Sequence, residues 1–204
     1  MLRRAVAVGA ASAVPHYALA QDGRSGAYTY VNLGAAAART LEAIVARLIP
    51  SDDNGPGALE AGAARYIDLA LGDALASFRP AYLTGLAAID AHARQSHGKP
   101  LSELGSDEQD SVLRDVEENR AGGFTPSSSA FFELVLGHTL EGTFCDPHYG
   151  GNHNFVGWDL VGYPGLRLAV AAEDQRFDSH PRVNRVSAYD LPMFEGTGGP
   201  SHDD

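Results

Sequence analysis

Histidine and acidic side chains gather between residues 138 and 153 in a spacing that could bind a metal ion. His138 and Glu141 stand three positions apart, which places both on one face of a helix, and Asp146, His148 and His153 follow. Since imidazole and carboxylate groups are zinc ligands, one hypothesis is an independent metal-dependent periplasmic enzyme that uses His138, Glu141 and His148. The sequence lacks an H-E-x-x-H motif. We favour the alternative that His138 packs in a bundle and the later histidines are loop residues.

The same stretch is rich in glycine and aromatic residues. Residues 142 to 165, GTFCDPHYGGNHNFVGWDLVGYPG, hold six glycines and the only tryptophan of the chain. Glycine permits tight turns with positive φ, so several glycines in a short span predict a fixed, non-helical shape. Five aromatic side chains add apolar area to this frame: Phe144, Tyr149, Phe155, Trp158 and Tyr163. Either they form an interface anchored by Trp158, or they cap the end of a helical bundle.

Motifs for other kinds of catalysis are missing from the sequence. It has no G-x-S-x-G motif, and GPGALEAG at residues 55–62 lacks the G-x-G-x-x-G spacing of a dinucleotide-binding loop. Cys145 is the single cysteine, so the chain cannot provide a C-x-x-C-H haem site or hold an iron–sulfur cluster. The thiol is either buried or bridged to another chain. SDDNG at residues 51–55 predicts a turn rather than a calcium loop. No cofactor is therefore expected in this chain.

Helical periodicity before residue 142 predicts the elements that position this stretch. A capping box of Ser106 and Gln109 is expected to begin the fourth helix, and Ser127 to open a fifth that is apolar on nearly all sides and therefore central. The five expected helices cover about 35–49, 56–78, 80–95, 106–121 and 127–142, with Pro56 in the first turn of the second. The predicted fold is mainly α: a bundle of about five helices, an irregular segment rich in glycine and aromatics, and an extended C-terminal arm.

The first twenty residues have the pattern of an export signal. Arg3 and Arg4 precede a mildly apolar stretch, and Ala18 and Ala20 form an A-x-A cleavage site. The paired arginines and the weak apolar region are similar to a twin-arginine signal, which carries folded proteins, with an ordinary secretory signal as the alternative. The expected organisation is an export signal over 1–20, a flexible segment over 21–34, a helical domain over 35–165 and a C-terminal arm over 166–204.

Composition limits the classes of partner. The 204 residues are 44% hydrophobic, which suits one domain with a sizeable core. The formal net charge of −11 disfavours nonspecific binding to nucleic acid. No apolar run is long enough to span a bilayer, so an integral membrane protein is not expected.

The segment EGTFCDPHYGGNHNFVGWDLVGYPG resembles the gluconate 2-dehydrogenase subunit 3 family, whose pattern is roughly E-G-x-F-x-D-P-x-Y-G-G-N followed by G-W and G-Y-P-G. LIPSDDNGPGALEAGAARYID, residues 48–68, is similar to an earlier block of the family. The matching late residues are Glu141, Gly142, Phe144, Asp146, Pro147, Tyr149, Gly150, Gly151, Asn152, Gly157, Trp158, Gly162, Tyr163, Pro164 and Gly165. The resemblance spans most of residues 35 to 165.

The resemblance implies a noncatalytic small subunit of a periplasmic complex associated with the inner membrane. In such complexes a large flavoprotein of the glucose–methanol–choline type holds FAD, and a multihaem cytochrome c commonly carries haem c and passes electrons onward. The small subunit would assist assembly or twin-arginine export of the flavoprotein. The candidate partner-binding residues are Phe144, Cys145, Asp146, Tyr149, Gly150, Gly151, Asn152, Trp158, Tyr163 and Pro164. The sequence does not identify which sugar or sugar acid is oxidised.

Overall fold

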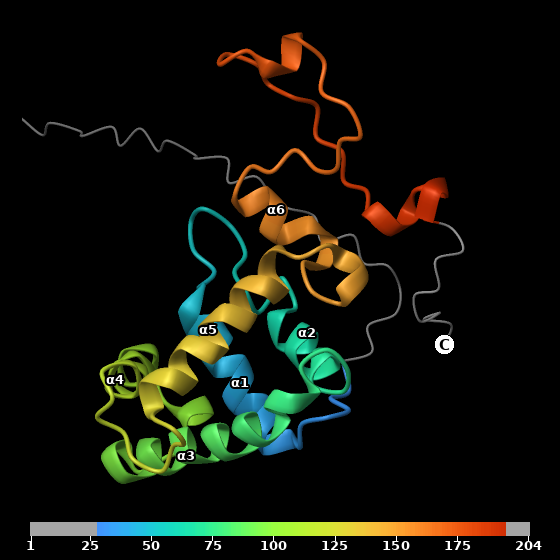
Figure 1. The fold of residues 1–204 in the computed structure, drawn as a ribbon. Coiled ribbons are helices and arrows are strands. Elements are labelled where there is room, and N and C mark those ends of the chain that lie inside the picture. The colour runs from blue at the N-terminus through green and yellow to red at the C-terminus, as the bar shows by residue number, and fades with distance from the viewer. Residues whose placement is uncertain (1–27, 195–204) are drawn as a thin grey trace, which may run out of the picture.

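Six α-helices form within residues 28–194, the part of the chain that the computed structural model describes (Figure 1). The helices are α1 (Ala35–Leu48), α2 (Ala63–Ala70), α3 (Arg79–His97), α4 (Ser106–Glu117), α5 (Ser128–Phe144) and α6 (Val156–Leu160). These residues contain no strand, only two isolated bridges, so the prediction of a mainly α fold is confirmed. No helix in this range has both the length and the apolar character that a membrane span requires.

Helix α5 occupies the centre of the bundle, as its apolar sequence predicts. It packs against α1, α2, α3, α4 and α6. The predicted apolar faces of the surrounding helices point toward it and toward each other. Their buried members include Leu41, Ile44 and Val45 of α1, Tyr82, Leu86 and Ile89 of α3, and Val112, Leu113 and Val116 of α4. Each fully buried aliphatic side chain contributes about 1.5–3 kcal/mol, so these faces provide the main drive for the bundle.

The second helix begins later than the sequence predicts. Pro56 lies in a turn region rather than in a first helical turn, and α2 starts only at Ala63. Gly62 has a φ of +77°, which interrupts helical geometry, and the backbone of Gly57 lies so close to Ile49 that any Cβ would overlap its carbonyl oxygen. The two glycines therefore make residues 49–62 a folded connector. As predicted, the SDDNG stretch is a turn, in which the Asp52 carboxylate accepts the Asn54 N–H at 2.8 Å.

The cap of the fourth helix also differs from the prediction. Ser106 is the first helical residue, and Gly105 occupies the cap position. The Glu108 carboxylate accepts the Gly105 N–H at 3.1 Å, while the Gln109 side chain donates to the Leu101 carbonyl at 3.0 Å. The prediction that Ser106 and Gln109 form the capping box is therefore wrong by one residue. Gly105 and Glu108 take the two positions, because the Glu108 carboxylate reaches the free N–H of Gly105.

A buried carboxylate fixes the chain just before α1. Asp68 of α2 is fully buried. It accepts the Tyr28 hydroxyl at 2.7 Å and the backbone N–H groups of Val31, Asn32 and Leu33 at 2.8, 3.0 and 2.9 Å. Composition predicts a flexible segment over residues 21–34, but this side chain and the Asn32 amide, which donates to the Asp68 carbonyl at 2.7 Å, hold residues 28–33 against α2.

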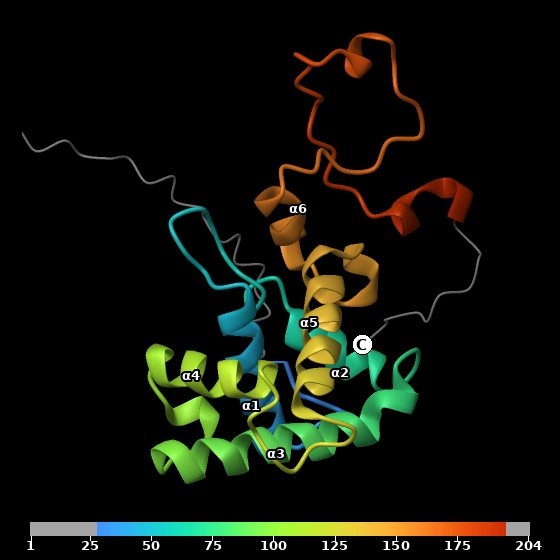
Figure 2. The same ribbon diagram turned by 60° about the vertical axis from the view of Figure 1, so that its left-hand side comes forward.

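The C-terminal arm leaves the helical body after α6 and then returns to it. Figures 1 and 2 show residues 166–184 as an orange loop that stands away from the helices. The loop closes where the Asn184 N–H donates to the Pro164 carbonyl at 2.6 Å. Short 3₁₀ turns follow at Ala188–Asp190 and Pro192–Phe194. Residues 1–27 and 195–204 lie outside the described residues, and with them the predicted signal residues Arg3, Arg4, Ala18 and Ala20.

Candidate functional site

The segment after α5 folds around one buried asparagine. Asn152 is fully buried with a φ of +44°, a conformation that asparagine tolerates better than most residues. Its amide donates to the Cys145 carbonyl at 2.8 Å, and its side-chain oxygen accepts the Gly157 N–H at 2.8 Å. Its own N–H donates to the Gly142 carbonyl at 2.8 Å. One residue therefore joins the end of α5, the turn that follows and the start of α6.

Three of the glycines are required by close backbone approach around this asparagine. A Cβ on Gly142 would lie 2.8 Å from Cδ1 of Tyr66 on α2. Gly151 lies so close to the Gly142 carbonyl oxygen that a Cβ would overlap it, and Gly157 lies equally close to the Thr143 carbonyl. The fixed, non-helical shape that the glycines predict is thus produced by backbone contact as well as by turn geometry.

Trp158 is packed inward at the end of the bundle. Its side chain is 8% exposed, and its indole N–H donates to the Phe144 carbonyl at 3.0 Å. The rings of Phe155 and Tyr163 pack against it with centroid distances of 5.1 and 4.9 Å. This packing agrees with the interpretation of the aromatics as a cap, and it leaves little of the indole exposed to a partner.

Asp146 ties the arm to the same segment. Its carboxylate accepts the His148 N–H at 3.0 Å, the Ser187 hydroxyl at 2.6 Å and the Ala188 N–H at 2.8 Å. Two further contacts form beside the Asp146 carboxylate. Tyr149 and Tyr189 share a hydroxyl hydrogen bond of 2.6 Å, and the His148 ring stacks on Tyr189 at 3.8 Å. We call these contacts of residues 146–149 with residues 187–189 the arm clasp.

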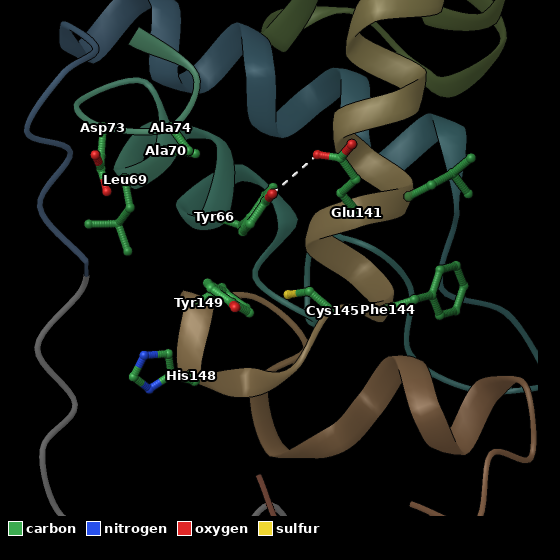
Figure 3. A pocket seen from close by; sticks show the side chains of 11 residues that line it. Tyr66, Leu69, Ala70, Asp73, Ala74, Glu141, Phe144, Cys145, His148 and Tyr149 are labelled. Atoms are coloured by element: carbon green, nitrogen blue, oxygen red, sulfur yellow. Dashed lines mark hydrogen bonds between the residues drawn. The ribbon is translucent and has the colours of Figure 1, made fainter. Parts of the chain in front are cut away.

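An open groove of about 830 Å³ lies between α2, the end of α5 and the 3₁₀ turn at Pro147–Tyr149 (Figure 3). Its walls are mainly apolar. The lining residues are Tyr66, Leu69, Ala70, Asp73, Ala74, Leu140, Glu141, Phe144, Cys145, His148 and Tyr149. The groove therefore offers an apolar surface with a few polar groups, which come from each of its walls.

The polar groups of the groove are not poised for nucleophilic chemistry. The Tyr66 hydroxyl donates to Glu141 at 3.1 Å, and burial together with this carboxylate raises the pKa of Tyr66 to about 12. Burial raises the pKa of the Cys145 thiol to about 11. The thiol is protonated at neutral pH, whereas a reactive cysteine must supply a thiolate. The arrangement is better suited to binding than to covalent catalysis.

The three residues of the metal hypothesis are not brought together as a ligand set. His138 is 7% exposed, its Nδ1 lies 2.9 Å from the Tyr82 hydroxyl, and burial lowers its pKa. Glu141 accepts the Tyr66 hydroxyl, and His148 stacks in the arm clasp. Among residues 28–194, no group of three or more histidine, cysteine, aspartate or glutamate side chains is placed to hold a metal ion.

The structure divides the candidate partner-binding residues into two groups. Gly150, Gly151, Asn152, Trp158 and Pro164 are buried or half-buried in the frame, and Asp146 holds the arm. Phe144, Cys145 and Tyr149 line the groove, and Tyr149 and Tyr163 are exposed large side chains.

Sequence reasoning missed the wall that α2 and the turn after it contribute to the groove. A signal for it existed, because Tyr66, Leu69, Ala70 and Asp73 lie at i, i+3, i+4 and i+7, the spacing of a second helical face. The buried face of the same stretch, represented by Ile67 in α2 and Leu71 directly after it, obscured that pattern.

Comparison with known proteins places this frame in a family. A model of the family described as gluconate 2-dehydrogenase subunit 3 matches residues 35–165, which include all six helices and the Asn152 frame. No curated protein and no solved structure matched the chain. The family match covers more than half of the chain and confirms the resemblance that the glycine and aromatic motif indicates. The chain therefore belongs to the gluconate 2-dehydrogenase subunit 3 family.

Proposed function

We propose that this chain is a noncatalytic subunit that binds the FAD-containing subunit of a gluconate 2-dehydrogenase-like complex in the periplasm. The observation that carries the proposal is the family match over residues 35–165, whose description names a numbered subunit of an oxidoreductase. The partner is a large flavoprotein of the glucose–methanol–choline type, and a multihaem cytochrome c completes the complex at the inner membrane. Oxidation of the sugar or sugar acid occurs in the flavoprotein.

The groove is the surface that best fits this docking role. It is open and mainly apolar, and the candidate residues Phe144, Cys145 and Tyr149 line it beside the exposed Leu140. Aromatic and aliphatic side chains that become desolvated supply most of the affinity at protein interfaces. The buried Asn152 hydrogen bonds fix the turn that forms one wall, so little conformational freedom is lost on binding.

Co-purification tests the subunit proposal directly. The full-length chain, tagged at its C-terminus in its native host, should recover a large protein with the absorbance of a flavin. The free chain alone should show no dye-linked dehydrogenase activity. Recovery of stoichiometric zinc or iron with the free chain, or activity without a partner, would contradict the noncatalytic assignment.

Export of the complex is the second part of the proposal. A flavoprotein that lacks a signal of its own would cross the membrane folded and bound to this chain, through the paired Arg3 and Arg4. Replacement of both arginines by lysine should leave both proteins in the cytoplasm. Replacing Arg39 and Arg114, two exposed arginines of the helical body, by lysine is the matched control. Periplasmic flavoprotein in the Arg3/Arg4 variant would remove the escort role and leave the subunit role standing.

A further inference from the structure

The groove carries acidic side chains and no basic partner for them. Asp73 and Glu141 line it (Figure 3), whereas none of the described lining residues is a lysine or an arginine. Within residues 28–194 the Asp73 carboxylate forms no hydrogen bond or ion pair. The Glu141 carboxylate accepts one hydrogen bond, from Tyr66. Since the rest of the walls are mainly apolar, the groove suits an occupant that combines apolar side chains with positive charge.

Two segments of the chain lie outside the described residues, and only one of them has this chemistry. In residues 1–27, Arg3 and Arg4 directly precede AVAVGAASAV, residues 5–14, a stretch of alanine, valine, glycine and serine. Residues 3–14 contain no acidic side chain. Residues 195–204 have three acids and neither arginine nor lysine. Charge therefore selects the N-terminal segment over the C-terminal one as an occupant of the groove.

The size of the groove also agrees with this segment. Its volume of about 830 Å³ is within the range of about 300–1,000 Å³ for sites that hold small ligands. A site of this size can take a short stretch of chain whose side chains are small. Residues 5–14 have no side chain larger than valine, so several of them can enter the groove together.

The chain enters the described structure at the helix that forms one wall of the groove. The Tyr28 hydroxyl donates to Asp68 of α2 at 2.7 Å, and Arg65 of the same helix lies over the Tyr28 ring. Leu69, the next residue after Asp68, lines the groove. Val14 lies fourteen positions before Tyr28, a stretch that spans up to about 50 Å when fully extended. The apolar stretch can therefore reach the groove, and its attachment to α2 raises its effective concentration there.

We propose that residues 3–14 occupy this groove in the free chain, with the two arginines against Asp73 and Glu141, and that the flavoprotein releases them when it docks there. The inference rests on the proposed function and adds the regulation of the same surface. In a lone subunit the predicted export segment is covered, and in the assembled pair it is free. Export then follows assembly, because the flavoprotein must displace the segment first.

Disulfide trapping tests this placement, because Cys145 is the only cysteine of the chain and lines the groove. Val8→Cys adds a second thiol in the apolar stretch of the full-length chain, purified without its partner and with residues 1–20 retained. Mild oxidation should give an intrachain disulfide, identified by mass spectrometry. Adding Asp73→Arg should slow its formation about tenfold, because like charges then meet in the groove. Asp73 is exposed, so the melting temperature should not change.

An exchange of charges separates ion pairing from a nonspecific effect. Arg3→Glu with Arg4→Glu should also slow trapping in the Val8→Cys chain. Combining these changes with Asp73→Arg should return the rate to within about threefold of the starting value, because opposite charges meet again. Asp53→Arg makes the same charge change at an exposed residue outside the groove, and it should leave the rate unchanged. An excess of the flavoprotein that co-purifies with the wild-type chain should slow trapping about tenfold by displacing the segment.

The other outcomes overturn the placement, the release or the proposed function separately. Absence of the disulfide, a rate that Asp73→Arg leaves unchanged, or no recovery in the charge exchange overturns the placement and leaves the proposed function standing. Disulfides between two chains would assign the groove to the segment of a second copy instead. Trapping that excess flavoprotein does not slow overturns the release alone. If the wild-type chain recovers no flavoprotein, the proposed function and the release both fail, and trapping in the free chain still decides the placement.

Discussion

Asn152 is the residue on which the segment after α5 depends. Its side chain satisfies the Cys145 carbonyl and the Gly157 N–H inside the protein. Asn152→Ala leaves both groups without these partners, and each buried unsatisfied group costs about 1–3 kcal/mol. We expect the free energy of unfolding to fall by roughly 2–4 kcal/mol, measured by urea denaturation.

Asn154→Ala is the matched control for this measurement. Asn154 also has a positive φ, +53°, but its side chain is exposed. Asn154→Ala should lower the free energy of unfolding by only about 1 kcal/mol, because alanine is less stable than asparagine in the left-handed backbone conformation. Equal losses in the two variants would show that backbone strain, rather than hydrogen bonding, makes Asn152 important.

His138 should make stability depend on pH. Burial lowers its pKa in the folded protein, so the folded state binds fewer protons than the unfolded state once the pH approaches the ordinary histidine pKa of about 6.5. The free energy of unfolding therefore has this contribution in full above that pH and loses it as the pH falls. Urea denaturation between pH 7.5 and 5.5 should show a steeper acid loss for the wild type than for His138→Gln.

The exposed His153 provides the comparison for the same experiment. His153→Gln should keep the wild-type slope, because it leaves the buried His138 in place. If His138→Gln and the wild type lose stability in parallel, another group controls the acid response.

At the scale of one element, α5 contains two glycines with opposite roles. Nothing lies within 4 Å of the position that a Cβ would take on Gly137, whereas a Cβ on Gly142 meets Tyr66 at 2.8 Å and Ala63 at 2.9 Å. Gly137→Ala should raise the free energy of unfolding by about 0.5–1 kcal/mol through helix propensity. Gly142→Ala should lower it by roughly 1–3 kcal/mol because α2 and α5 must move apart. Thermal unfolding of both variants measures the difference, and stabilisation by both would contradict the close approach.

The sequence predicts the helices better than the connections, for a physical reason. The faces of α1, α3 and α4 follow a local 3.6-residue period, so they can be read without knowing the neighbours. The start of α2 depends on Gly57, where the backbone approaches Ile49. The periodic spacing of apolar residues in the sequence does not reveal a close approach between two backbone segments. The glycine-rich segment predicts a fixed shape. The role of Asn152 cannot be predicted in this way, because it depends on backbone groups of three separate residues, Gly142, Cys145 and Gly157, that only the fold brings together.

The arm could not be predicted in the same way. Asp146 meets Ser187 and Ala188 across about forty residues of chain, and each residue is an ordinary polar or small residue in its own context. Pairing at such a distance leaves no pattern in a single sequence. The composition rich in glycine, proline and aspartate indicates irregular backbone correctly, yet an extended arm and an arm that returns have the same composition.

At the scale of the whole molecule, Asp146 connects the helical body to its C-terminal arm. Asp146→Ala removes the acceptor of the Ser187 hydroxyl and of the Ala188 N–H. Hydrogen exchange at residues 187–190 should become faster, while exchange in α3 stays unchanged because the core is not touched. Asp53→Ala, at an exposed turn residue, is the control. Unchanged exchange at residues 187–190 would mean that the tyrosine pair and the Arg185 contact hold the arm without Asp146.

The anchoring of residues 28–33 by Asp68 has a mechanical consequence for any pull on the chain from its N-terminal side. Tension that reaches Tyr28 acts on this carboxylate, which holds four donors from one short stretch. Four of these bonds end on the Asp68 side chain, and the Tyr30 hydroxyl donates to Glu42 of α1, so several bonds must break before residues 28–33 separate from the helices. A translocation motor that threads unfolded chains must break this grip before it can extract α1. Any process that moves the folded domain as a unit leaves these bonds intact.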